Sequence, residues 1–245
     1  MATVVEKEVT YKDGDTECVG FLAYDDAAIQ GGRKVPGVLV VHQWMGLTDY
    51  EKRRARMLAE LGYVALAADI YGKGVRPTDS KGAGEQAGKF RSDNSLFRSR
   101  LNAGLGALKA QPGVDAARLG AIGYCFGGGG VLELARSGAN VKGVVSFHGG
   151  LGTPHPEDAK NIKGKILVCH GAIDRMETPE SIAAFQKSME DAKVDYVFMA
   201  FAGAKHAFTQ PEAGNNPDSP VAYNKAADER SWIAMKNFFT EIFSK

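Results

Sequence analysis

Apolar residues in this chain alternate between continuous runs and helically spaced sets. The continuous runs, which are typical of strands covered on both faces of a sheet, occupy residues 35–41, 63–68, 118–122, 142–148, 165–170 and 195–201. Between the runs, apolar side chains recur every three to four residues, as at Phe97, Leu101, Leu105 and Leu108. Strands that alternate with helices predict an α/β protein with a mostly parallel, doubly wound sheet and helices on both faces.

Local signals place the ends of several elements. Residues 4–11 and 17–24 suit two strands joined through Asp13-Gly14, which predicts an antiparallel hairpin at the edge of the sheet. Thr48 and Glu51 have the spacing of a capping box, and Thr178-Pro179 is typical of a helix start.

Two further segments have a distinct composition. Residues 71–90 are rich in Gly, Lys, Ser, Asp and Gln, so we expect a surface loop with a short helix, and a rim over the active site there. The last helix carries apolar side chains at helical spacing, namely Trp232, Met235, Phe239 and Ile242.

Composition limits the classes of function. The chain has 245 residues, 44% of them hydrophobic, and we expect one domain over 1–245, as a monomer or homodimer. A net charge of +1 without a long basic run gives no electrostatic support for binding nucleic acid or a membrane surface. Three cysteines and the absence of a signal-peptide pattern in the first residues predict a reduced, cytoplasmic protein.

The segment from Gly123 to Gly127 reads Gly-Tyr-Cys-Phe-Gly, which is the spacing of a nucleophile elbow with cysteine in place of serine. An apolar run precedes it and a helix-forming segment follows, as this strand-to-helix turn requires. A thiol at a helix N-terminus is favoured in its thiolate form. We therefore predict that Cys125 is the nucleophile of a hydrolase, and that the glycines at 127–130 allow close packing of the helix.

A cysteine nucleophile needs a base and a group that orients the base. In α/β-hydrolases the order along the chain is nucleophile, carboxylate, histidine, each after a strand. Asp174 and His206 follow the two last predicted strands, so both are expected at the carboxyl edge of the sheet. We predict that His206 is the base and that Asp174 orients it, with Glu177 as the competitor of Asp174.

Other side chains have weaker assignments. The backbone N–H groups of Phe126 and Trp44 are the expected oxyanion donors. Gln43, Tyr71, His148 and Phe208 are candidate substrate contacts, although each also suits a packing role. His42, His170, Cys18 and Cys169 are most simply structural, and Asp69 is expected to anchor the turn at 70–72. No spacing of Cys or His resembles a metal site.

Taken together, Gly-Tyr-Cys-Phe-Gly-Gly at 123–128, the Asp174 and His206 loops, His-Gln-Trp-Met-Gly at 42–46 and Ala-Asp-Ile-Tyr-Gly at 68–72 resemble the dienelactone hydrolase family. The resemblance runs from about residue 35 to the last helix. It implies an α/β-hydrolase fold, no cofactor, and hydrolysis of esters or lactones by a Cys125-His206-Asp174 triad, with Phe126 and Trp44 as oxyanion donors.

Two positions depart from the family pattern. Gln43 stands where the best-known members have a glutamate that activates the thiol, and a neutral amide cannot accept a proton. Gln210 stands where those members have an arginine that binds the substrate carboxylate. The sequence therefore predicts neutral esters or lactones with good leaving groups as substrates, with promiscuous hydrolysis of aryl phosphotriesters as a secondary activity. The alternatives are carboxymethylenebutenolidase activity proper, a hydrolase-fold binding protein without activity, and a thiol sensor.

Overall fold

The computed structural model describes residues 3–244. Met1 and Ala2, which belong to the segment searched for a signal peptide, lie outside this range. The chain forms two compact units, Met1–Ile122 and Gly123–Lys245. The expectation of a single domain over 1–245 stays a prediction.

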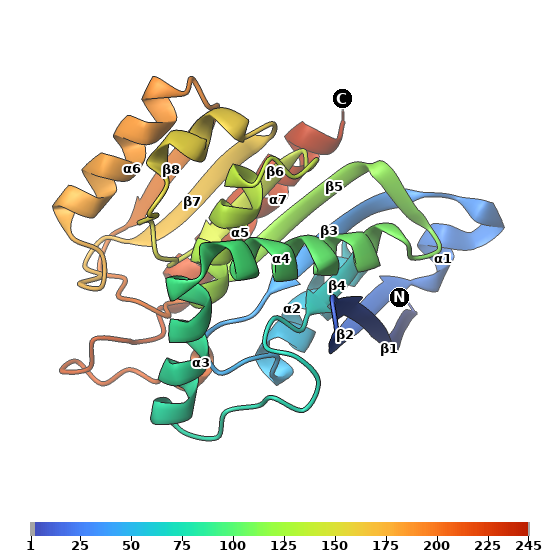
Figure 1. Ribbon diagram of the computed structural model, residues 1–245, viewed down its shortest axis with the longest axis horizontal. Coiled ribbons are helices and arrows are strands. Elements are labelled where there is room, and N and C mark those ends of the chain that lie inside the picture. Colours follow the sequence, from blue (N-terminus) through green and yellow to red (C-terminus); the bar gives the residue numbers. More distant parts are fainter. Residues whose placement is uncertain (1–2, 245) are drawn as a thin grey trace. The chain divides into compact units, whose positions relative to one another are not determined.

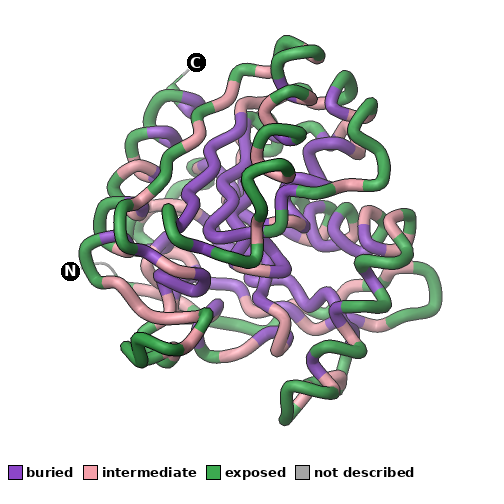
Figure 2. The backbone as a smooth tube through the Cα atoms, turned by 90° about the vertical axis from the view of Figure 1, so that its left-hand side faces the viewer, coloured by how far each residue is buried: buried purple, intermediate pink, exposed green. Residues whose placement is uncertain are grey.

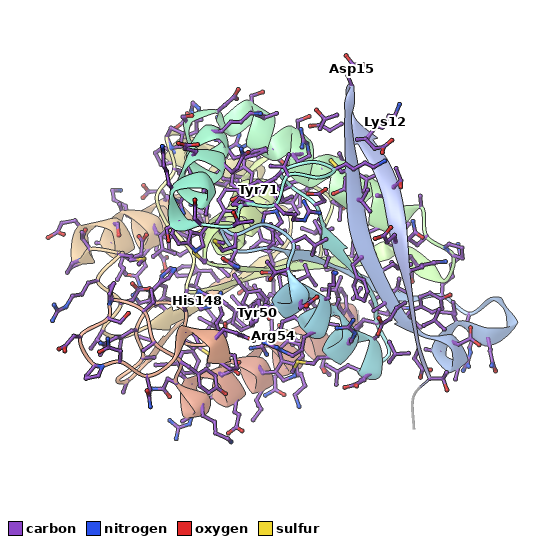
Figure 3. The ribbon with its side chains drawn as sticks, turned by 90° about the horizontal axis from the view of Figure 1, so that it is seen from below. Lys12, Asp15, Tyr50, Arg54, Tyr71 and His148 are labelled. Carbon is purple, nitrogen blue, oxygen red and sulfur yellow. The ribbon has the colours of Figure 1, made fainter. Side chains whose placement is uncertain are left out.

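The first unit begins with the predicted antiparallel hairpin. Strands β1 (Val4–Asp13) and β2 (Thr16–Asp25) pair along their full length, and Asp13 lies opposite Thr16. Gly14 has a φ of 57°, which glycine adopts at little cost in a two-residue turn. Lys12 and Asp15 project from this tip (Figure 3).

The remaining strands of the first unit continue this sheet. β4 (Val64–Ala68) pairs antiparallel with β2 and parallel with β3 (Val35–Val41), which gives the order β1-β2-β4-β3. β3 and β4 are almost entirely buried, as their continuous apolar runs predict. Figure 2 colours buried stretches of the backbone purple and exposed ones green. The predicted antiparallel edge followed by parallel pairing is confirmed.

Helices alternate with these strands (Figure 1). The helical elements are α1 (Asp26–Ile29), the 3₁₀ turn η1 (Gln30–Gly32), α2 (Asp49–Glu60), α3 (Ser80–Ser92) and α4 (Asn94–Lys109). The Thr48–Glu51 capping box of α2 is confirmed, since both of its reciprocal bonds form. The apolar face predicted at Phe97–Leu108 is buried on α4.

The segment 71–90 differs from its prediction. The expected short helix is instead a helix of 13 residues, α3, which begins at Ser80 with Asp79 as its N-cap. Ala83, Ala87 and Phe90 are fully buried on one face of α3. The stripe consists of two alanines and one phenylalanine, which is a weak apolar signal in the sequence.

The strand β5 (Val114–Tyr124) runs across the division between the units. Among the described residues, the second unit continues with the strands β6 (Gly143–Phe147), β7 (Lys165–Gly171) and β8 (Tyr196–Phe201), which lie in this order and are parallel to one another. Its helical elements are α5 (Phe126–Arg136), η2 (Pro156–Asn161), α6 (Pro179–Asp191), η3 (Pro211–Ala213) and α7 (Lys225–Phe243).

β8 is less buried than its apolar run indicated. Its residues are all intermediate or exposed, with Val197 46% and Met199 40% accessible. β8 pairs only with β7 in the described sheet order, so one of its sides has no neighbouring strand. A continuous apolar run therefore does not distinguish an edge strand from a central one.

Candidate active site

Cys125 lies on a tight turn between β5 and α5. Its φ of 54° and ψ of −114° are strained values for a residue with a side chain. The backbone crosses itself so closely here that a Cβ on Gly123 would be 1.9 Å from the carbonyl oxygen of Gly127. Only glycine fits such an approach, which accounts for the spacing read from the sequence.

The glycines that open α5 serve close packing. A Cβ on Gly128 would meet the Cα of Gly149 at 2.7 Å and the Ser146 hydroxyl at 2.9 Å. This confirms that the run at 127–130 brings the helix against β6 and the loop after it. Phe126 is the first residue of α5, so its N–H lies at the helix N-terminus beside Cys125.

We expect that Gly123→Ala lowers the free energy of unfolding by about 3 kcal/mol or more, because a backbone atom must move to relieve the overlap. Gly88→Ala on α3 is the matched control, since a Cβ there meets no atom within 4 Å. Removing a helical glycine should stabilise that variant by about 0.5–1 kcal/mol. Chemical denaturation compares the two, and equal stabilities would contradict the close crossing.

His206 and Asp174 are brought together by the loops after β8 and β7. The Nδ1 atom of His206 lies 2.8 Å from Oδ2 of Asp174, and both side chains are buried. Oδ1 of Asp174 accepts a hydrogen bond from the Met176 N–H at 2.9 Å. Burial raises the pKa of Asp174, but the hydrogen bonds and positive charge of its partners hold it below its usual value. Asp174 is therefore favoured as an anion that accepts a hydrogen bond at the Nδ1 side of the imidazole.

Glu177, the competing carboxylate, has a different neighbour. Its Oε2 accepts the hydroxyl hydrogen of Ser181 at 2.7 Å, within the first turn of α6. The structure thus brings Asp174, and not Glu177, to His206.

The loop that carries His206 is fixed by the segment before α7. Ala222 N–H donates to the His206 carbonyl at 3.1 Å, and Asn224 N–H donates to the Phe208 carbonyl at 3.0 Å. The side chain of Asn224 also caps α7 by accepting from the Ala227 N–H at 3.1 Å. His206 is thereby held between two independent backbone contacts.

Cys125 also influences the imidazole ring of His206. The Nε2 atom of His206 has no partner with full hydrogen-bond geometry among the described residues, but the Cys125 side chain is close enough to affect the ring. Burial by itself lowers the pKa of His206. Interactions with Asp174 and Cys125 outweigh burial and raise that pKa to about 10. The surroundings therefore favour an imidazolium flanked by two acidic groups.

His148 packs directly against His206. The two rings meet edge to face with centroids 5.1 Å apart, and the His148 ring also meets Phe208 at 5.2 Å. The Nε2 atom of His148 lies 2.7 Å from the Thr209 hydroxyl. His148, Phe208 and Thr209 are completely buried, so their geometry bears on the position of His206 (Figure 3 labels His148).

His170 is a further histidine near this group. It ends β7, is buried, and packs against Phe198 with centroids 5.5 Å apart. Burial lowers the pKa of His170, as does the charge of His206, while Asp174 and Glu177 oppose this effect. Its proximity to Asp174 was not expected from sequence, where it read only as a buried strand end.

In the first unit, the segment after β3 carries Gln43 and Trp44. The Gln43 side-chain oxygen accepts from the Met45 N–H at 3.0 Å, and Tyr71 donates its hydroxyl hydrogen to the Trp44 carbonyl at 2.8 Å. Figure 3 labels Tyr71, which is 4% accessible. Gln43 and Tyr71, both candidate substrate contacts, thus hold the backbone around Trp44.

The structural expectations for His42 and Asp69 are confirmed. His42 is fully buried and accepts from the Ile70 N–H at its Nε2, so its Nδ1 carries the hydrogen donated to the Gln43 carbonyl at 2.6 Å. Burial lowers its pKa to about 4. Asp69 accepts hydrogen bonds from the Val19 N–H and the Gly72 N–H, which anchors the predicted turn.

Within residues 3–244, no group of three or more His, Cys, Asp or Glu side chains has an arrangement that could hold a metal ion. None of the helices described is both long and apolar enough to cross a bilayer.

Comparisons with known proteins agree with this fold. A model of the dienelactone hydrolase family matches residues 20–243. A solved structure of a protein called m3DLH is 43% identical, with a TM-score of 0.93, and the match covers 98% of this chain and 99% of that one. The dienelactone hydrolase-like promiscuous phosphotriesterase P91, from metagenomic libraries, is 40% identical with a TM-score of 0.92, over 99% of this chain and 100% of that one.

A curated relative matches over a similar length. A protein of Synechocystis sp. named "Putative carboxymethylenebutenolidase" is 27% identical over 250 residues, which is 96% of either chain. The match of nearly the whole chain to solved structures confirms the predicted α/β fold class.

Proposed function

Because the chain belongs to the dienelactone hydrolase family, we propose that it hydrolyses esters or lactones with good leaving groups, using Cys125 as nucleophile. The observation that carries the proposal is the 2.8 Å contact between His206 Nδ1 and Asp174 Oδ2, with Cys125 acting on the same imidazole ring. A nucleophile, a base and an orienting carboxylate are the groups that acyl transfer requires.

The reaction proceeds in two steps. The Cys125 sulfur attacks the carbonyl carbon, the oxyanion is stabilised by the Phe126 N–H group at the start of α5, and the C–O bond to the leaving group breaks. The proton on His206 goes to the departing oxygen, which leaves a thioester on Cys125. Water then loses a proton to His206 and attacks the thioester, releasing the acid and restoring the thiolate–imidazolium pair.

The sulfur nucleophile favours good leaving groups. In the tetrahedral intermediate a thiolate departs more readily than an alkoxide, so attack on an alkyl ester mostly reverses. Phenol esters, enol esters and strained lactones have leaving groups that compete with sulfur. Gln210, where an arginine would bind a carboxylate, supports neutral over anionic substrates.

A leaving-group series tests the proposal. We expect kcat/KM for an aryl ester to exceed that for the ethyl ester of the same acid by about 100-fold or more, a difference of about 3 kcal/mol in barrier. The panel includes a neutral lactone and a lactone that carries a carboxylate, with Cys125→Ala as the background. Similar rates for aryl and alkyl esters, or preference for the charged lactone, would contradict this substrate class and favour carboxymethylenebutenolidase activity.

A second activity is supported by the likeness to the phosphotriesterase P91. In a neutral aryl phosphotriester, the Cys125 sulfur would attack phosphorus and displace the aryl oxide, and water would then cleave the S–P bond. We include such a phosphotriester in the same panel. A binding protein without activity would turn over none of these substrates, and a thiol sensor would instead form a stable oxidised cysteine that reductant restores.

A further inference from the structure

The end of β6 lies between the turn that carries Cys125 and the neighbouring strand β7. The Cys125 N–H donates to the Phe147 carbonyl at 3.0 Å, and the His148 N–H donates to the Cys169 carbonyl at 2.8 Å. His148 has a φ of 40°, a positive value that is uncommon for a residue with a side chain and that clusters at functional sites. Backbone bonds on both sides therefore fix the point from which the His148 side chain projects.

The far end of the His148 side chain is fixed as well. Its Nε2 atom lies 2.7 Å from the Thr209 hydroxyl, and its ring meets Phe208 edge to face. His148, Phe208 and Thr209 have no exposed surface. A side chain without exposed surface acts on a reaction through its neighbours. The neighbour that takes part in the proposed chemistry is His206, whose ring centroid is 5.1 Å from that of His148 at an interplanar angle of 65°.

His206 needs a support besides Asp174. The 2.8 Å contact between His206 Nδ1 and Asp174 fixes one atom of the ring, but the imidazole can still turn about the line of that bond. Such a turn would move Nε2, the atom that must face the Cys125 sulfur to exchange a proton with the reacting groups. The ring of His148 opposes the turn, because a buried and fixed neighbour leaves no space for it.

Thr209 lies on the same loop as His206, three positions later. The Gln210 N–H donates to the Ala207 carbonyl at 2.9 Å, which closes a turn around Phe208 and Thr209. One short loop therefore carries both the candidate base and the hydroxyl that holds the ring beside it.

We propose that His148 is a positioning residue, fixed by the Thr209 hydroxyl, that sets the plane of the His206 imidazole, an inference that rests on the function proposed above. His148 touches no reacting atom in this scheme and transfers no proton. It keeps Nε2 of His206 directed at the Cys125 sulfur while the imidazole first gives and then takes a proton. All of these residues belong to the second unit.

Two substitutions at position 209 separate the hydroxyl from the packing. Thr209→Val keeps nearly the same shape and removes the hydroxyl, whereas Thr209→Ser keeps the hydroxyl and removes a buried methyl group. Both should lower stability, Thr209→Ser through a cavity and Thr209→Val through the lost partner of the His148 ring. If Thr209 served only folding, the activity of each variant would follow its stability. A positioning role predicts that activity follows the hydroxyl.

For an aryl ester, Thr209→Val should lower kcat by about 10-fold, less than the roughly 100-fold that a misplacement of about 1 Å can cost. KM should change by less than about threefold, because His148 has no surface for the substrate to touch. Thr209→Ser should keep kcat within about threefold of the wild type. Thr240→Val, at an exposed position of α7, is the control for loss of a threonine hydroxyl and should match the wild type.

A nuclear magnetic resonance signature needs no substrate. In protein with isotope-labelled histidine, the Nδ1–H of His206 should give a sharp signal in the wild type and in Thr209→Ser, and its loss or shift in Asp174→Asn identifies it. In Thr209→Val this hydrogen should exchange with water about tenfold faster, because the ring turns away from Asp174 more often.

A measurement on the wild type alone does not depend on the folding of any variant. The ring protons of His148 and His206 should show a nuclear Overhauser effect, and His148 should give one sharp set of ring signals. Absence of that effect, wild-type kcat in Thr209→Val, or an equal loss in Thr209→Ser and Thr209→Val would overturn the proposal. Failure of the proposed function looks different, since the wild type would leave the aryl ester intact while the His206 signal still responds to Thr209→Val.

Discussion

Cys125→Ala is expected to lower kcat/KM for an aryl ester by about 10³-fold or more, because no other group can form the acyl-enzyme. The thiol lies on a strained turn at the start of α5, and its two fellow cysteines, Cys18 and Cys169, are completely buried. In the wild type, phenol should appear in a rapid burst equal to the enzyme concentration if cleavage of the thioester is slow. The burst is measured by stopped-flow absorbance.

Cys125→Ser refines this prediction. A hydroxyl loses its proton far less readily than a thiol, so His206 must remove it during attack, and we expect turnover at least about 100-fold below the wild type. Circular dichroism serves as the control for folding in both variants. Unchanged turnover in Cys125→Ser or Cys125→Ala would contradict cysteine catalysis and leave hydrolysis to another residue.

His206→Ala has the second largest expected effect. Without the imidazolium, Cys125 loses the positive charge that favours its thiolate, and alkylation by iodoacetamide near pH 7 should slow by about 10- to 100-fold. The wild-type rate should change little between pH 6 and 8, because the pKa of His206 is raised to about 10 and the pair stays charged. In the variant the rate should rise with pH toward the ordinary thiol value of about 8.5.

The exposed His155 offers a matched control for loss of a histidine, since it lies in a loop before η2. His155→Ala should alkylate at the wild-type rate, and Cys125→Ala gives the background from the buried thiols. Equal alkylation of His206→Ala and the wild type would refute the pairing of thiol and imidazole. Asp174→Asn removes the negative charge but keeps the size of the side chain. Its alkylation rate should lie between those of His206→Ala and the wild type.

Much of the scaffold could be predicted because it depends on local patterns. The apolar runs at 35–41 and 165–170 coincide with β3 and β7, and Thr48 and Thr178 begin α2 and α6 as expected. The turn at Gly123–Gly127 was readable because so few residues tolerate its geometry.

The parts that sequence did not reveal depend on contacts between distant segments. For residues 71–90 a loop with only a short helix was expected, because Gly and Ala fill much of α3 and its buried stripe is narrow. The place of Glu51 beneath Gln43, and that of Thr209 against His148, have no signature in spacing. Asp174 was preferred to Glu177 from its position after β7 alone, and the side-chain contact with His206 shows directly which carboxylate lies beside the imidazole.

Asn224 connects the last helix of the chain to the loop that carries His206. Its side chain caps α7, and its N–H donates to the carbonyl of Phe208, two positions after His206. Unwinding of α7 would therefore release the loop that positions the His206 ring before the rest of the second unit unfolds. A protein damaged at that terminus should lose its reactivity first and its structure later.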